Sequence, residues 1–218
     1  MRFQLAYYAQ DTPKRVLRLL RHSRKANLSE ARWWAALVLL IVELVGVFDF
    51  YEAVNRWLLP GVGRLSAPQR LAAQSVFGES LNFDRILIDN HAAIACKKGD
   101  FAYVSFHIVN HFGRIEDWHL IHELMHVWQY ERVGAPYILC ALQAQHSPEG
   151  YNYGGTTMLI EHQKTGLRAF NFEQQADIIA DYFRIKTGLK PQWSDAVATK
   201  WYEPYIEELR GGIYYKER

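Results

Sequence analysis

The sequence predicts an α+β fold, with a small mixed or antiparallel sheet packed on one long helix, a C-terminal helical subdomain and further helices at the N-terminus. Half of the 218 residues are hydrophobic, which is enough to bury a sizeable core. Short runs that alternate between apolar and polar residues occupy positions 85–108. An apolar stretch with helical spacing, Trp118 to Tyr130, follows them.

The first 60 residues are predicted to form a helical appendage to a domain that comprises residues 61–218. Residues 12–24 have the spacing of a short basic amphipathic helix. Pro60 and Gly61 interrupt regular structure, which places the boundary there. The formal net charge of +2 does not indicate a nucleic-acid partner. Seven cations nevertheless gather near the N-terminus with few acids among them: Lys14, Arg15, Arg18, Arg21, Arg24, Lys25 and Arg32.

The stretch from Trp33 to Phe48 is strongly apolar, but Glu43 interrupts it. A membrane-spanning helix needs about 20 mainly apolar residues, and an ionisable group is costly at the bilayer centre. We therefore expect a buried or oligomer-forming helix, followed by another at 50–59. Membrane contact through residues 33–48 is the alternative. The compartment of the protein stays open between the two.

The residues that precede the long helix are predicted to form a short helix and then strands. Ser66 opens the helix, and Gly78 ends it. If the last strand lies at the sheet edge beside the long helix, its free backbone can pair with an extended peptide; an interior position is an equal alternative. The strands are expected at 85–89, 92–96 and 101–108, with residues 97–100 as a hairpin turn.

The C-terminal part is predicted to be helical, with a loop rich in Gly, Pro, Ser and Asn at 145–157. Cys96 and Cys140 lie outside any Cys-x-x-Cys spacing, so we expect two free thiols, with a single disulfide as the alternative. The helices are expected at 137–144, 172–186 and 194–210.

The motif with the clearest chemistry is His122-Glu123-Leu124-Met125-His126. On a helix, His122 and His126 stand one turn apart on one face, where two imidazoles can bind a single metal ion, with zinc as the expected metal. Glu123 is rotated by about 100° from His122, so it is placed to take a proton from water rather than to act as a third ligand. The alternative is a buried helix that contains these residues by chance.

A catalytic zinc site needs a third protein ligand and one open position. One large class of zinc enzymes uses a histidine six residues after the second histidine, with a glycine at the third position. Arg132 and Gln129 occupy those positions here, which excludes that class.

Glu173 is the expected third ligand, because it lies on a predicted helix with an apolar side. Asp177 follows one turn later on the same face, where a carboxylate can accept the free ring N–H of a ligating histidine. Two further histidines, His146 and His162, are the reserve ligands.

The two signatures together resemble the gluzincin branch of zinc metallopeptidases, in which His-Glu-x-x-His is followed on a later helix by Glu-x-x-x-Asp. More narrowly, residues 65–79, 122–129 and 171–183 are similar to the Vgr-related and Rhs-associated zinc peptidases of bacteria, and to domains found with contractile injection systems. The resemblance spans residues 65–185. It is specific at the two metal motifs, loose elsewhere, and does not include the N-terminal third.

The resemblance implies a zincin-like fold and a zinc-dependent hydrolysis of peptide bonds, with Glu123 as the general base for the attacking water. It also implies a link to a bacterial secretion system or toxin, and a peptide or protein substrate. Gluzincins use a Tyr or His to hydrogen-bond the oxyanion of the tetrahedral intermediate. We expect Tyr153 in this role, with Tyr151 and His162 as alternatives.

Two other classes of function stay open. One is a zinc-stabilised interaction or assembly module without catalysis. The other is a membrane-associated processing protease, in which residues 33–48 contact the bilayer. Oligomers that form through the N-terminal helices are compatible with either class.

Overall fold

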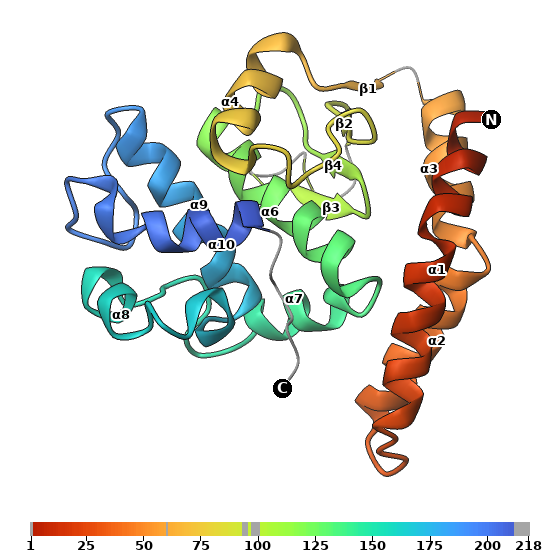
Figure 1. Cartoon of the computed structure of the whole chain (residues 1–218). Helices are drawn as coiled ribbons and strands as arrows, with labels where there is room; N and C mark the ends of the chain where they lie inside the picture. Colours follow the sequence, from red (N-terminus) through yellow and green to blue (C-terminus); the bar gives the residue numbers. More distant parts are fainter. Residues whose placement is uncertain (1, 60, 93–95, 97–100, 212–218) are drawn as a thin grey trace.

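The computed structural model describes residues 2–59, 61–92, 96 and 101–211, and it confirms the predicted α+β class (Figure 1). One small sheet packs against helices, chiefly the long helix Asp117–Val133. The α-helices are α1 (Arg2–Arg24), α2 (Ala31–Leu44), α3 (Val47–Leu58), α4 (Ala67–Phe77), α6 (Asp117–Val133), α7 (Tyr137–Gln145), α8 (Gly155–Glu161), α9 (Phe172–Lys186) and α10 (Glu203–Gly211). The strands are β1 (Val62–Arg64), β2 (Leu87–Asp89), β3 (Tyr103–Ser105) and β4 (Ile108–Asn110), and two 3-10 turns are η1 (Gly166–Ala169) and η2 (Thr199–Trp201).

The sheet is mixed, with the strand order β1-β2-β4-β3. β1 is antiparallel to β2, β2 is parallel to β4, and β4 is antiparallel to β3. β3 is therefore an edge strand, and it packs beside α6. Among the described residues, the predicted strand at 85–89 is confirmed as β2, whereas β1 lies where the sequence predicted only a break.

The predicted single strand at 101–108 is wrong, because the chain turns within it. Phe106 adopts a left-handed conformation with φ of 63°, which separates β3 from β4. The backbone N–H of His107 then donates to the buried carboxylate of Glu52 in α3, 3.0 Å away. The predicted hairpin turn at 97–100, and most of the strand predicted at 92–96, lie outside the described residues.

α6 is the central helix, and its middle section is buried on every side from Leu120 to Tyr130. α9 covers one side of it, and α4, α7 and the strands β3 and β4 pack on others (Figure 1). A helix enclosed in this way carries apolar side chains over most of its circumference, which explains why this stretch of the sequence is largely apolar. Its buried polar residues include the His-Glu-x-x-His motif. The predicted long helix is confirmed.

Two local features position the elements around α6. The side chains of Asn171 and Gln174 form a reciprocal capping box that starts α9, so that Glu173 lies in the first turn of this helix. The second feature is Gly134, which has φ of 81° and ends α6 at its C-terminus. A Cβ at Gly134 would come within 2.6 Å of Glu43 Oε2, so glycine is also required by the close approach of α2.

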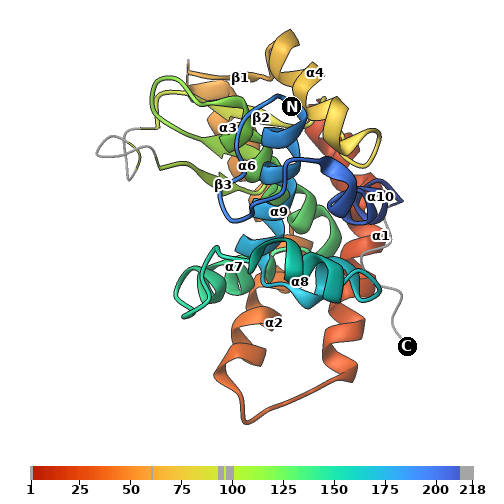
Figure 2. The same cartoon turned by 90° about the vertical axis from the view of Figure 1, so that its left-hand side faces the viewer.

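The N-terminal third is more helical than predicted. The predicted helix at 12–24 is the C-terminal half of α1, which begins at Arg2 and contains Pro13. The apolar helix predicted to continue to Phe48 ends at Leu44, because Gly46 takes φ of 81° and the chain restarts as α3. The three helices stand together along one side of the molecule, and the turn between α1 and α2 projects beyond the other elements (Figures 1 and 2).

Buried charges attach these helices to the rest of the protein. Arg15 lies 2.6 Å from Asp49, and Asp49 also contacts Arg85 of the chain segment before β2. Glu43 accepts hydrogen bonds from Arg18 and from the backbone N–H of Ala135, which follows α6. The domain boundary at residues 60 and 61 stays a prediction, but buried ion pairs and hydrogen bonds join the two parts.

No single helix within the described residues is long and apolar enough to cross a membrane. Taken together, α2 and α3 meet the length and composition of a span, but they are bent by 59° at the break between them. Cys96 and Cys140 are free thiols, as expected.

Replacing Arg15 with Met should lower the free energy of unfolding by about 3–5 kcal/mol, because Asp49 would keep a buried charge with only part of its compensation. The exposed Arg21 in the same helix is the matched control, and Arg21→Met should change the stability by less than about 0.5 kcal/mol. Urea unfolding followed by circular dichroism measures both. Equal stability of the two variants would contradict the role given to the buried network.

Candidate metal centre

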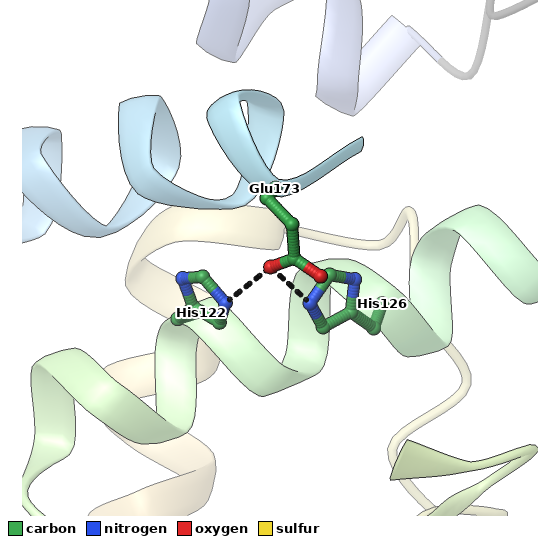
Figure 3. A group of neighbouring side chains, drawn as sticks. All are labelled: His122, His126 and Glu173. Carbon is green, nitrogen blue, oxygen red and sulfur yellow. Dashed lines mark ion pairs between the residues drawn. The ribbon is translucent and has the colours of Figure 1, made fainter. Parts of the chain in front are cut away.

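Three side chains from two helices converge in the centre of the protein (Figure 3). His122 and His126 come from α6, and Glu173 comes from the first turn of α9. The Oε2 atom of Glu173 lies 3.3 Å from Nε2 of each histidine, and all three residues are buried. Within the described part of the chain, these are the residues whose donor atoms lie close enough together to hold a metal ion.

The imidazole rings are oriented by hydrogen bonds on their far sides. His122 Nδ1 lies 2.7 Å from Asp177 Oδ1, and His126 Nδ1 lies 2.8 Å from Gln129 Oε1. Both acceptors are oxygen atoms, so each Nδ1 carries the proton and each Nε2 presents its lone pair toward Glu173 in the neutral ring. Asp177 therefore lies where its predicted role requires, and the role itself stays a prediction.

Gln129 and Gln145 are supporting residues that the sequence analysis missed. Besides contacting His126, Gln129 donates through Nε2 to the carbonyl of Phe172 and to Gln175, both in α9. Gln145, at the end of α7, donates to Glu173 Oε1 over 2.9 Å. The contact between Gln129 and His126 could have been predicted, because the two residues are three apart on one helix. Nothing local in the sequence indicated the contact between Gln145 and Glu173.

Without a metal ion, the two histidines attract protons and Glu173 stays ionised. Burial alone would lower the pKa of His122. The charge and hydrogen bond of Asp177, together with the hydrogen bond of Glu173, outweigh the effect of burial and raise this pKa well above its ordinary value. Burial raises the pKa of Glu173, but His126 and His122 hold it well below its usual range. A metal ion must displace protons from these histidines, so its affinity should fall as the pH is lowered.

One oxygen atom in this group has no hydrogen bond within the described residues. Glu173 Oε2 is buried and points between the two Nε2 atoms, while Glu173 Oε1 is bonded by Gln145. A buried carboxylate oxygen without a hydrogen bond is costly unless a cation compensates it. Two imidazole nitrogens and one carboxylate oxygen form a donor set that suits zinc.

Glu123 lies beside the histidines but does not belong to the convergent group. Its Oε1 atom is 3.4 Å from His119 Nε2, and its buried Oε2 atom has no hydrogen bond within the described residues. Burial raises the pKa of Glu123, but His119, His122 and His126 outweigh it and hold the pKa below its ordinary value. Glu123 is therefore a carboxylate near neutral pH and able to accept a proton.

A cavity of about 660 Å³ opens onto these residues. His122, Glu123, His126 and Glu173 form one part of its wall. The edge strand β3 with its neighbours Phe101 to Phe106, and apolar side chains of α7, form another. The cavity is large enough for several side chains of a bound molecule, so the convergent group is accessible from one side.

The structure places the two candidate tyrosines, Tyr153 and Tyr151, in different surroundings. Tyr153, the expected oxyanion donor, is only 2% exposed and donates to Asp181, and its hydroxyl lies 2.7 Å from that of Tyr202. It packs in the core and does not line the cavity, so the choice of Tyr153 was wrong. Tyr151 does line the cavity, with its ring centre 6.0 Å from that of His122. Tyr151 lies in a turn, so the two tyrosines point in different directions although they are only two residues apart.

Tyr151 keeps its hydroxyl proton in this environment. Burial, with the charges of Glu173 and Glu123, raises the pKa of its phenol well above the ordinary value. The reserve ligands lie elsewhere: His146 is exposed and contacts the carbonyl of Leu142, and the ring of His162 packs against Phe170. Neither lines the cavity.

No family model and no solved structure matches the chain. The chain is similar to the type VI secretion system spike protein VgrG2b of Pseudomonas aeruginosa, with 30% identity over 134 residues. The match covers 55% of this chain but only 13% of the spike protein, so the likeness concerns one segment of a much longer protein. At this coarse level, the similarity links the chain to bacterial secretion systems.

Changing Glu173 to Ala should abolish stoichiometric zinc binding, whereas His146→Ala and His162→Ala should leave it intact, because Glu173 is the one of these three residues that reaches both imidazoles. Metal content after dialysis, measured by mass spectrometry, gives the stoichiometry. Loss of zinc from the His146 or His162 variant would show that the ligand set is different.

Replacing Gln129 with Met should weaken zinc binding by about tenfold to a hundredfold, because the His126 ring would lose its orienting acceptor. Competition with a chromophoric chelator measures the affinity. The exposed Gln163→Met is a control, and it should bind zinc as tightly as the unchanged protein.

Proposed function

We propose that this protein is a zinc-dependent peptidase that hydrolyses peptide bonds with Glu123 as the general base. The observation that carries the proposal is the buried group of His122, His126 and Glu173, with the separate carboxylate of Glu123 facing the same cavity. Bound by these three ligands, zinc would supply a Lewis acid that polarises a carbonyl group and lowers the pKa of water.

The residues around the cavity have distinct roles in this proposal. Glu123 takes a proton from the attacking water and then delivers it to the leaving amine. Tyr151 donates its hydroxyl to the oxyanion of the tetrahedral intermediate. Asp177 and Gln129 hold the two imidazoles in the orientation that the ligands need.

The edge strand β3 supports a peptide as the substrate. β3 pairs with β4 on one side, and residues 101–106 line the cavity beside the candidate metal centre. The hydroxyl of Tyr137 donates to the carbonyl of Val104 over 2.8 Å, which fixes the strand against α7. An extended peptide could add to this edge and bring a scissile bond to Glu123.

The accessible cavity favours an enzyme over a zinc-stabilised assembly module. A structural zinc site is closed by four protein ligands, whereas the convergent group within the described residues has three and faces open space. The spike protein VgrG2b is a component of a type VI secretion system by its name. We extend that context to this chain and propose that the peptidase acts together with a bacterial secretion system.

Glu123→Gln should retain zinc and lower peptide hydrolysis by about 10²–10⁴-fold, because an amide cannot accept the proton of the attacking water. Digestion of an unbiased peptide library by the zinc-loaded protein, followed by mass spectrometry, measures the activity. The amide has the size of the carboxylate, so the variant should fold normally. Undiminished cleavage by this variant would refute the proposed role of Glu123.

Tyr151→Phe should lower kcat by about 10²–10³-fold with little effect on stability, because it removes an oxyanion donor at the cavity. Tyr153→Phe should do the reverse: it should lower the stability by about 1–3 kcal/mol, because Asp181 loses a buried donor, and retain most of the activity. Kinetic assays and urea unfolding of both variants separate the two roles. A larger loss of kcat in Tyr153→Phe than in Tyr151→Phe would instead assign the oxyanion role to Tyr153.

A further inference from the structure

The acidic residues of α2 and α3 all point into the protein. Glu43, Asp49 and Glu52 are buried. Their partners are Arg18 for Glu43, Arg15 and Arg85 for Asp49, and His107 for Glu52. The structure describes every residue from 31 to 58, so the outer face of these two helices has no negatively charged side chain.

This outer face is apolar. In α2 the exposed apolar side chains recur at helical spacing, and in α3 they include Phe50, which is 70% exposed, and Trp57, which is 85% exposed. Large apolar side chains gathered on one exposed face are costly in water and mark a contact surface. We call the following residues the outer face: Trp34, Val38, Ile41, Val45, Val47, Phe50, Tyr51, Trp57 and Leu58.

Tryptophans lie toward the two ends of the outer face, Trp34 in α2 and Trp57 in α3. The exposed Arg56 precedes Trp57, whereas Arg32 hydrogen-bonds to Gln143 of α7 and is not part of this face. The projecting turn between α1 and α2 adds further exposed cations, Arg24 and Lys25. An apolar helical face with tryptophans toward its ends and exposed cations beside it matches the interface of a bilayer, where indole rings lie among the headgroups and cations contact anionic lipids.

We propose that the outer face of α2 and α3 binds the surface of an anionic lipid bilayer, with both helices lying in the headgroup region. Insertion as a span would remove Glu43, Asp49 and Glu52 from their buried partners, which a peripheral position leaves undisturbed. A second copy of the chain is a poorer occupant, because it would bring its own exposed cations toward the same cations beside this face. This inference does not depend on the peptidase activity.

Vesicle flotation with the full-length chain tests the proposal. The unchanged protein should float with vesicles that contain phosphatidylglycerol, and bind those of phosphatidylcholine alone roughly tenfold more weakly. The double variant Phe50→Asp with Trp57→Asp should bind the anionic vesicles at least roughly tenfold more weakly than the unchanged protein. The matched control is Leu71→Asp with Val197→Asp, which places the same charges at exposed apolar residues elsewhere; Val197 is 94% exposed. Circular dichroism confirms that each variant is folded.

Binding that is lost in the Phe50 and Trp57 variant and kept in the control would support the proposal. Failure of the unchanged protein to float with anionic vesicles would overturn it, as would equal binding of both double variants. A stable dimer, which sedimentation would detect without lipid and which the Phe50 and Trp57 changes would dissociate, would assign the outer face to a second copy instead. Each outcome is independent of zinc and of hydrolysis, so it is distinct from the tests of the proposed function.

Discussion

The candidate site depends on the polar contact between α6 and α9. Glu173 reaches both histidines because α9 has a fixed height and rotation relative to α6. Buried hydrogen bonds between the two helices determine that height and that rotation. Asp177 bonds His122 from α9, while Gln129 bonds His126 and returns to the carbonyl of Phe172. Buried polar groups of this kind are costly in any other register, because each would lose its partner. The same bonds that align the helices also orient the imidazoles, so the fold and the site share one set of interactions.

A second set of buried charges links the N-terminal helices to the opposite side of the core. Glu52 of α3 holds His107 in the turn between β3 and β4, and Phe48 stacks on Phe106 in the same turn. The edge strand that lines the cavity is thus supported from behind by α3. Because these acids are used for internal pairs, the opposite face of α2 and α3 has no acidic side chain and is mainly apolar. One arrangement of charges therefore accounts both for the attachment of the helices and for the composition of their outer face.

The sequence predicted the parts of the site that depend on local spacing. His122 and His126 are four residues apart on a strongly periodic helix, and Glu173 and Asp177 repeat that spacing on another, so helical geometry alone places each pair. Prediction from the sequence failed where the chain departs from regular structure. A left-handed Phe106 divides the expected strand, and non-glycine residues give no warning of that conformation. Tyr151 and Tyr153 diverge because a turn and the buried Asp181 decide their directions, and Gln145 reaches Glu173 only through tertiary packing.

The proposed chemistry requires that two Nε2 atoms and one carboxylate oxygen bind zinc and leave a position open to the cavity. A crystal structure of the zinc-loaded full chain, with anomalous data recorded on both sides of the zinc absorption edge, would show whether they do. We expect one anomalous peak between His122, His126 and Glu173, with no fourth protein ligand and with Glu123 facing the ion's open side. A peak elsewhere in the chain, or a zinc ion enclosed by four protein ligands, would contradict it.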